Sequence, residues 1–220
     1  SEPGRPLYDR RREMVVEPLS PAHVGALLDL SPAEALDAYV VIGGFPVLAQ
    51  EWGAGRTRDE YLTEALTDPT SFLVVSAERA LAAEFQQEAH ARGVLGAIGA
   101  DARVHKAIGQ RTGLSATTLA RAFEILDAKG AIDRVTPYSA KPAPKNRRYR
   151  VADPYLRFWL RFVGPYIDEI ERGRGSVLLD RLAAAWTTYR GKAIEPIVAE
   201  SIERMLPDGR FGDAARHVGA

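Results

Sequence analysis

The sequence predicts a mainly α-helical fold with one small β-hairpin. Three observations predict it. Apolar residues recur at helical spacing along most of the 220 residues. Serine–proline and aspartate–proline pairs mark several helix starts. Alternating, strand-like residues occur only near 131–136 and 146–152, on either side of a connection with three prolines.

Residues 1–85 are predicted to form a first domain of short helices. Ser20-Pro21 and Ser31-Pro32 each offer a capping hydroxyl followed by a proline in the first helical position. Val24, Leu27 and Leu28 are expected to form the buried stripe of the first helix. Gly43-Gly44-Phe45-Pro46 breaks the chain, a short helix or a turn is expected at 47–52, and further helices are expected at 58–66 and 70–85.

Residues 86–163 are predicted to form a winged helix-turn-helix domain. A first helix is expected over 86–100 and a second over 104–112, with Gly113 in the tight turn. Ser115 is a plausible N-cap for a third helix that buries Leu119, Phe123 and Leu126 and ends at Gly130. The two strand-like segments then form the β-wing.

Charge is unevenly distributed along the chain. Residues 101–151 hold eleven Lys/Arg and four Asp/Glu, so they carry +7 while the remainder carries −7. Such a basic concentration on a winged helix is typical of a surface that binds duplex DNA. The residues predicted to contact DNA are Arg111, Thr117, Thr118, Arg121, Lys141, Lys145, Arg147 and Arg148. The alternative is a protein-interaction or dimerisation module, because winged helices also bind proteins.

A C-terminal helical region is predicted over 164–220. It follows an aromatic helix that starts at Asp153-Pro154, whose residues Tyr155, Phe158, Trp159 and Phe162 are expected in the core, joining the winged helix to the C-terminal helices. Two helices are expected after it, over 177–189 and 194–206, with Gly191 as the interruption.

Composition excludes several classes of site. The sequence has no cysteine, so it has no disulfide, thiolate nucleophile or cysteine-type zinc site. Its four histidines are scattered, and no catalytic or metal-ligating constellation can be assembled. The sequence has no run of 18 apolar residues and no signal peptide, so the chain is expected to be cytoplasmic and not to associate with a membrane.

Four motifs occur in an order that resembles a known family. They are Gly43-Gly44-Phe45-Pro46, the winged helix, the run from Tyr149 to Val163 with its Asp-Pro-aromatic-Leu-Arg-Phe-Trp core, and Tyr189-Arg190-Gly191-Lys192-Ala193-Ile194-Glu195. The chain resembles the C-terminal half of the archaeal-type ATPases, a branch of the STAND/AAA+ P-loop proteins. The resemblance implies a helical lid over 1–85, a winged helix over 86–163, and over 164–220 the start of a domain similar to PD-(D/E)XK nucleases.

The resemblance also implies cofactors and site residues. The parent protein is expected to hold a P-loop domain that binds ATP and Mg²⁺, and the present chain is expected to be a fragment of it. The expected partners are duplex DNA, the P-loop domain of the same chain and, as a further possibility, a second copy in a homo-oligomer. Gly44, Phe45 and Pro46 match a lid turn near the nucleotide, although a Gly-Pro turn is also a generic chain break.

Glu195 matches the first acidic position of the nuclease-like domain, with Ile194 where the family usually has Phe. The later acidic and Glu-x-Lys motifs do not occur in the sequence, and one carboxylate does not hold a catalytic cation. The chain itself is therefore predicted to have no cofactor, no metal and no catalytic residue, and its function is predicted to be regulatory DNA binding.

Overall fold

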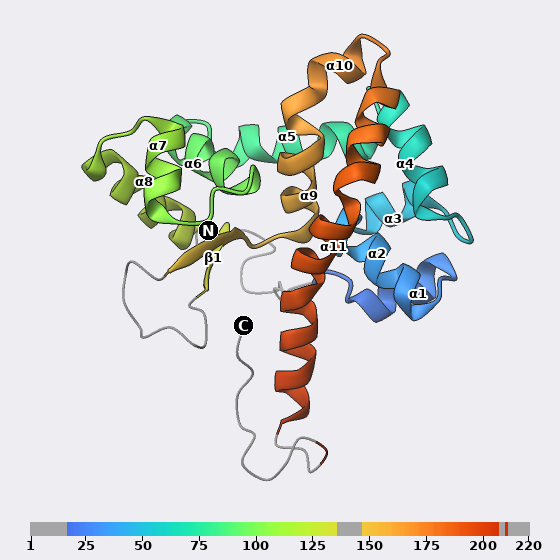
Figure 1. The fold of residues 1–220 in the computed structure, drawn as a ribbon. Coiled ribbons are helices and arrows are strands. Elements are labelled where there is room, and N and C mark those ends of the chain that lie inside the picture. The colour runs from blue at the N-terminus through green and yellow to red at the C-terminus, as the bar shows by residue number, and fades with distance from the viewer. Residues whose placement is uncertain (1–16, 136–146, 207–209, 211–220) are drawn as a thin grey trace, which may run out of the picture.

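The structure, a computed structural model, describes residues 17–135, 147–206 and 210 (Figure 1). This part of the chain is mainly helical with a small antiparallel sheet of two strands, which confirms the predicted fold class. The N-terminal helices and the winged helix lie on opposite sides of one central helix, α9, and a long helix, α11, runs past both (Figure 1).

The N-terminal helices are α1 (Pro21–Leu28), α2 (Pro32–Ile42), α3 (Pro46–Trp52), α4 (Arg58–Thr67) and α5 (Phe72–Glu84). Ser20 and Ser31 cap α1 and α2 with a proline at the start of each helix, as predicted. The predicted stripe of α1 is wrong at one position, because Leu27 is 51% exposed while Val24 and Leu28 are buried. Leu28 is buried where α1 packs against α2. Leu27 is rotated from it by about 100° around the helix axis, so its side chain points toward solvent.

The winged domain consists of α6 (Ala89–Gly99), α7 (His105–Thr112), α8 (Ala116–Ala128), β1 (Ile132–Val135) and β2 (Arg148–Val151). Gly113 has φ +66° and Gly130 has φ +62°, the left-handed conformations expected at both helix ends. The strands pair from Ile132 with Val151 to Val135 with Arg148. An isolated antiparallel bridge from Val104 to Arg148 extends the sheet by one short segment.

Helix α9 (Pro154–Phe162) fills the centre of the molecule. Its predicted core residues Tyr155, Phe158, Trp159 and Phe162 are all buried, as expected. Trp159 Nε1 donates a 2.8 Å hydrogen bond to the Val74 carbonyl, and the Tyr155 hydroxyl lies between the Leu73 carbonyl and the Ala77 amide of α5. The aromatic side chains therefore join the winged domain to the N-terminal helices as well as to α11.

The predicted division of the C-terminal region into two helices is wrong. A 3₁₀ turn (Gly164–Tyr166) and α10 (Ile167–Glu171) follow α9, and then α11 runs without interruption from Gly175 to Met205. Gly191 is helical because its neighbours are held in place: the Tyr189 hydroxyl donates to the Val40 carbonyl of α2 at 2.9 Å and Arg190 pairs with Asp37 of α2, while Lys192, on the other side of Gly191, pairs with Asp101. These contacts outweigh a cost of about 1 kcal/mol for glycine within a helix.

The two halves of α11 have different surroundings. Its first half packs against α4, with Leu178 and Leu182 buried, whereas Val198 and Met205 in its second half are exposed. Although α11 has 31 residues, no single helix in the described part is long and apolar enough to cross a membrane. Only α2 and α3 meet that criterion as a pair, and the pair is bent by 119°.

Candidate nucleic-acid interface

Helix α8 has one buried face and one exposed face. Leu119, Ala122, Phe123 and Leu126 are buried, and α8 packs mainly against α6 and β1. The opposite face consists of exposed residues, mostly small ones, which are Ala116, Thr117, Ala120, Arg121 and Glu124. Helices α7 and α8 lie at one edge of the molecule (Figure 1), so the N-terminal helices and α11 leave this face open.

The three α8 residues predicted to contact base edges differ in availability. Thr117 and Arg121 are exposed and, being four residues apart, lie on the same face of the helix. Thr118 is only partly exposed, and its hydroxyl lies 2.9 Å from that of Ser115, whose Oγ accepts a hydrogen bond from the Thr118 amide. Thr118 therefore belongs to the helix cap, while Thr117 and Arg121 are available to a ligand.

Helix α7, which contacts α8 through Gly109 near Leu119 and through His105 on Phe123, carries two exposed cations. The predicted residue Arg111 lies in its last turn and is exposed. Lys106, which the sequence analysis missed, is exposed in the first turn, where no side chain caps the free backbone amides. Free amides and a lysine at a helix start attract anions such as phosphates. In the sequence, a lysine two residues after the start of the helix predicted over 104–112 was the signal that could have identified Lys106 as a phosphate contact.

The cations of the winged domain fall into two groups. Five have a carboxylate partner: Arg92 with Glu78, Arg103 with Asp101, Lys129 with Glu84, Arg134 with Asp127, and Arg150 with Asp133. Within the described part of the chain, five others have no ion-pair partner, namely Lys106, Arg111, Arg121, Arg147 and Arg148. Unpaired and exposed cations are the ones free to contact phosphate.

The sheet separates Arg147 from Arg148, which the sequence had placed together. Tyr149 and Val151 point into the winged-domain core, where the Tyr149 ring stacks on Phe123 of α8 at 4.3 Å. Because side chains alternate along a strand, Arg148 is on the face of the sheet opposite Tyr149, and the same alternation predicts Arg147, which directly precedes β2, on the α8 side. Lys141 and Lys145, the other predicted wing contacts, lie outside the described residues.

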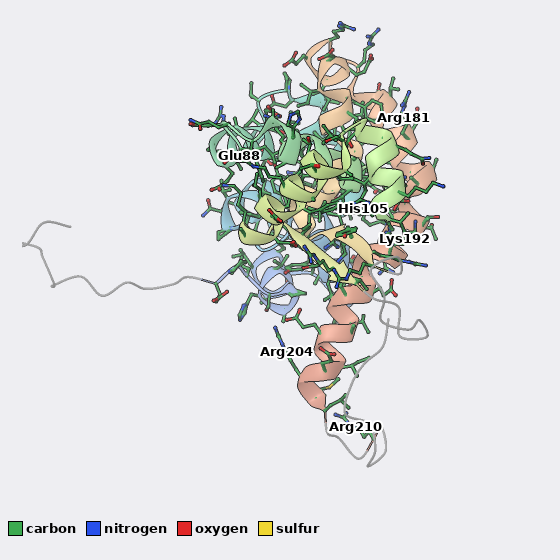
Figure 2. All side chains as sticks on the ribbon, turned by 90° about the vertical axis from the view of Figure 1, so that its left-hand side faces the viewer. Glu88, His105, Arg181, Lys192, Arg204 and Arg210 are labelled. Atoms are coloured by element: carbon green, nitrogen blue, oxygen red, sulfur yellow. The ribbon has the colours of Figure 1, made fainter. Side chains whose placement is uncertain are left out.

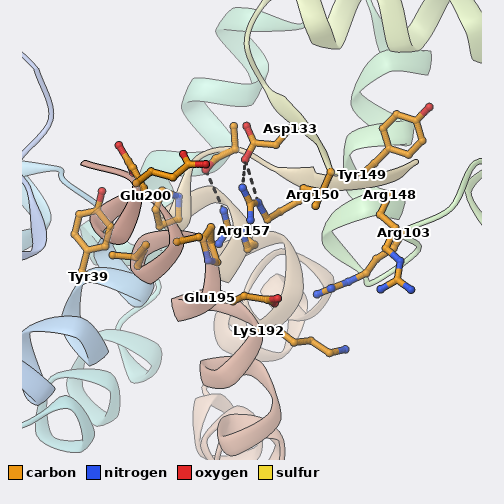
Figure 3. A pocket seen from close by; sticks show the side chains of 17 residues that line it. Tyr39, Arg103, Asp133, Arg148, Tyr149, Arg150, Arg157, Lys192, Glu195 and Glu200 are labelled. Atoms are coloured by element: carbon orange, nitrogen blue, oxygen red, sulfur yellow. Dashed lines mark hydrogen bonds and ion pairs between the residues drawn. The ribbon is translucent and has the colours of Figure 1, made fainter. Parts of the chain in front are cut away.

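The outer face of the sheet borders a cavity of about 550 Å³ on α11. Arg148 and the predicted acidic residue Glu195 both line it, together with Arg103, Lys192 and Glu200 (Figure 3). Figure 2 looks onto the edge of the molecule formed by α7 and α8, and it shows Lys192 on α11 next to the strands. Two predicted residues from distant parts of the sequence therefore share one cavity, which we call the wing groove.

Asp101 links the winged domain to α11 at the edge of this groove. Its carboxylate accepts hydrogen bonds from Arg103 at 2.8 Å and from Lys192 at 3.1 Å. Burial opposes ionisation of Asp101, but the bonds from Lys192 and Arg103 outweigh burial and lower the pKa of this carboxyl. Asp101 is therefore charged at neutral pH and stabilises the contact between the two elements.

The turn at Gly44, Phe45 and Pro46 has a clear structural role. The Gly44 carbonyl accepts a 3.0 Å hydrogen bond from the Leu19 amide, and Pro46 is the first residue of α3. Phe45 is 42% exposed, and its ring meets Tyr155 edge to face at 5.7 Å. These contacts explain a chain break at this position, and the proximity to nucleotide implied by the family resemblance stays a prediction.

Glu195 is exposed on α11, three residues after Lys192. Among the described residues, no group of three or more histidine, aspartate or glutamate side chains is arranged to hold a metal ion. The groove around Glu195 is lined by four carboxylates, those of Asp133, Glu195, Glu200 and Glu203, and by five cations, those of Arg103, Arg148, Arg150, Arg157 and Lys192. The cations outnumber the carboxylates, which does not resemble the oxygen-rich ligand set of a hard cation.

No family model matches the chain, and no curated protein or solved structure matches it.

Proposed function

We propose that the winged domain binds duplex DNA, with α8 in the major groove and the cations of α7 and Arg147 on the phosphate backbone. One observation carries this proposal: Lys106 and Arg111 of α7, Arg121 of α8 and Arg147 before β2 are exposed and have no ion-pair partner among the described residues. The paired cations stabilise the fold, and the unpaired ones remain for a polyanion.

The exposed face of α8 suits close approach to base pairs. Ala116 and Ala120 carry only methyl groups, so the helix backbone can enter a groove about 12 Å wide, and a methyl group can contact thymine. Thr117 offers a hydroxyl, and Arg121 can donate two hydrogen bonds to guanine. Glu124 lies further along the same face and can accept from cytosine.

Phosphate contacts are proposed on either side of α8. The first turn of α7 offers free amides and Lys106, and its last turn offers Arg111. Arg147 stands where the chain enters β2, on the α8 side of the sheet. Each such contact releases counterions from the DNA, so affinity depends on salt with a slope of about 0.9 per neutralised phosphate.

The wider setting that we propose is the regulatory, DNA-binding part of an archaeal-type ATPase. The order of the motifs from Gly43 to Glu195 supports it. ATP and Mg²⁺ would then act on a P-loop domain of the parent protein, and 164–206 would lead into its nuclease-like domain. The DNA-binding proposal does not depend on this setting.

Equilibrium binding to mixed-sequence duplex DNA across a range of salt concentrations tests the proposal. We expect log Kd to rise with log salt at a slope of about 3 or more, as three or more phosphate contacts require. Arg147→Ala should weaken binding to all sequences alike and lower that slope by about one. Arg121→Ala should cost about 1–3 kcal/mol on a preferred site and relax the choice of base there.

Arg172→Ala is the matched control, because Arg172 is an exposed arginine at the end of α10 without an ion-pair partner in the described residues. It should change neither affinity nor slope. Binding that is absent, insensitive to salt or equal for Arg121→Ala and Arg172→Ala would reject the DNA interface. In that case the small-residue face of α8 would be assigned to a protein partner or to a second copy of the chain.

A further inference from the structure

The wing groove lies on the opposite side of the sheet from the proposed DNA interface. The cavity of about 550 Å³ adjoins a second space of about 290 Å³, and the two share lining residues, which are Arg103, Tyr149, Arg150, Arg157 and Lys192. A volume of this size is within the range of sites for small molecules, about 300–1,000 Å³. The groove is therefore large enough for a small polar metabolite.

One end of the groove has more positive than negative charge. Arg103 and Arg148 lie together at that end, with Lys192 beside them (Figure 3). Asp101 is shared between Arg103 and Lys192, and Arg148 has no carboxylate partner within the described part of the chain. Apart from the pair of Arg150 with Asp133, the side chains at this end are four cations, Arg103, Arg148, Arg157 and Lys192, and two carboxylates, Asp101 and Glu195.

Arg157 forms part of the wall where the two spaces meet. Its guanidinium donates to the Val151 carbonyl at 2.8 and 3.0 Å and to the Ala152 carbonyl at 3.1 Å, with no salt bridge to a described carboxylate. Burial is the main cause that lowers the pKa of this guanidinium. Arg157 is partly buried, its hydrogen bonds go to neutral carbonyls, and the charges of Asp133 and Asp153 only partly offset the cost of burial, so an anion in the groove would stabilise it further.

The other end of the groove accepts hydrogen bonds. Glu200 and Tyr39 lie at that end (Figure 3), and Glu203 follows Glu200 by one turn of α11. Pro196, Ile197 and Ala199 give an apolar wall between the ends. Ionised carboxylates only accept hydrogen bonds, so this end suits hydroxyl or amino groups of a ligand.

We propose that the wing groove binds a phosphate monoester of a small molecule that carries hydroxyl or amino groups. The phosphate contacts Arg103, Arg148 and Lys192, and the hydroxyl or amino groups donate to Glu200 and Glu203. Nucleoside monophosphates and sugar phosphates share this chemistry. The ligand bridges β2 and α11, so it strengthens the contact that Asp101 makes between the same elements.

Calorimetric titration of the intact chain with inorganic phosphate, a nucleoside monophosphate and a hexose monophosphate tests this site. At least one of the two esters should bind at least tenfold more tightly than inorganic phosphate. Arg148→Gln should weaken all phosphate probes by about tenfold or more, since a charge-assisted hydrogen bond is worth about 1.5–3 kcal/mol. Arg148 has no partner in the described fold, so its replacement leaves the protein folded, which circular dichroism checks.

Two further variants make the test specific. Glu203→Gln should weaken the ester several-fold and leave inorganic phosphate unchanged, because only the ester reaches that end of the groove. Arg172→Gln should change neither. The proposal is overturned if neither ester binds at millimolar concentration, if neither binds more tightly than inorganic phosphate, or if Arg148→Gln binds as the unmodified chain does. Because Arg148 and Glu203 are not on the α8 side, failure of this site leaves the DNA-binding test unaffected.

Discussion

At the scale of single residues, the position of carboxylates decides what each cation can do. Arg134 of β1 is paired with Asp127 of α8, and Arg150 of β2 is paired with Asp133 of β1, so both arginines stabilise the hairpin. Arg121 and Arg147 are exposed without such a partner among the described residues, which leaves their donors free. A basic segment in a sequence is therefore a mixture of structural and available cations, and only the fold separates them.

Trp159 tests the central packing at this scale. Trp159→Ala should destabilise the fold by about 3–5 kcal/mol, the usual range for truncating a large buried aromatic side chain. Trp159→Phe keeps a ring but loses the bond from Nε1 to the Val74 carbonyl, so it should cost less than the alanine variant. Urea denaturation measures both. If both variants lost little free energy of unfolding, and by the same amount, the burial of the Trp159 side chain would be contradicted.

Asp101 gives a prediction about pH. Asparagine tolerates the left-handed φ of +76° at this position, so Asp101→Asn removes the charge and keeps the backbone. The folded-state pKa is lowered, so the contribution of the carboxylate is complete above the unfolded pKa and is lost as pH falls through the folded pKa.

The free energy of unfolding should accordingly differ between Asp101→Asn and the unmodified chain by a constant amount above about pH 5. Each pair with Asp101 is partly exposed to solvent, so the difference should be modest, about 0.2–1 kcal/mol per pair. It should shrink below about pH 4, in denaturation curves recorded at a series of pH values. A difference that grows at acid pH would contradict the ion pairs.

At the scale of elements, local signals predicted helix starts better than helix continuity. The caps at Ser20, Ser31 and Ser115 depend on neighbouring residues alone, and all three are confirmed. The wing strands were also predictable, because alternation is a local pattern. The continuity of α11 through Gly191 depends on contacts with α2, more than 140 residues away, and the sequence pattern does not contain them.

The wing groove was out of reach of sequence reasoning for the same reason. Arg148 and Glu195 were each identified as candidates, but for different functions. Their shared cavity follows from the packing of α11 beside the sheet, and Lys192 and Arg157 give no sequence motif that points to it. Likewise, the separation of Arg147 from Arg148 required knowing which face of the sheet is covered.

A pair of glycine substitutions tests the continuity of α11. Gly191→Ala should stabilise the protein by about 0.5–1 kcal/mol, because Gly191 is exposed, helical and open to an added methyl group. Gly130→Ala should destabilise it, because that residue has φ +62°. Thermal unfolding of both variants measures these changes in stability. Destabilisation by Gly191→Ala would indicate a helix break at that position, as the sequence alone suggested.

At the scale of the whole molecule, the sheet of the winged domain separates two surfaces. Helices α7 and α8 form one surface at the outer edge, and the wing groove against α11 forms the other (Figure 1). Helix α9 holds the winged domain against the N-terminal helices through Tyr155 and Trp159. The arrangement gives α8 a fixed orientation while leaving its exposed face uncovered by the other described elements.

The most direct test of the central claim places a DNA-cleaving reagent on α8. The sequence has no cysteine, so Thr117→Cys creates a single attachment point on the exposed face, and Arg172→Cys creates a matched control on α10. Bound to duplex DNA, the Thr117→Cys conjugate should cut both strands in the pattern of a reagent lying in the major groove, and the Arg172→Cys conjugate should not cut. Equal cutting by the two conjugates, or none by either when the protein is bound, would contradict the insertion of α8.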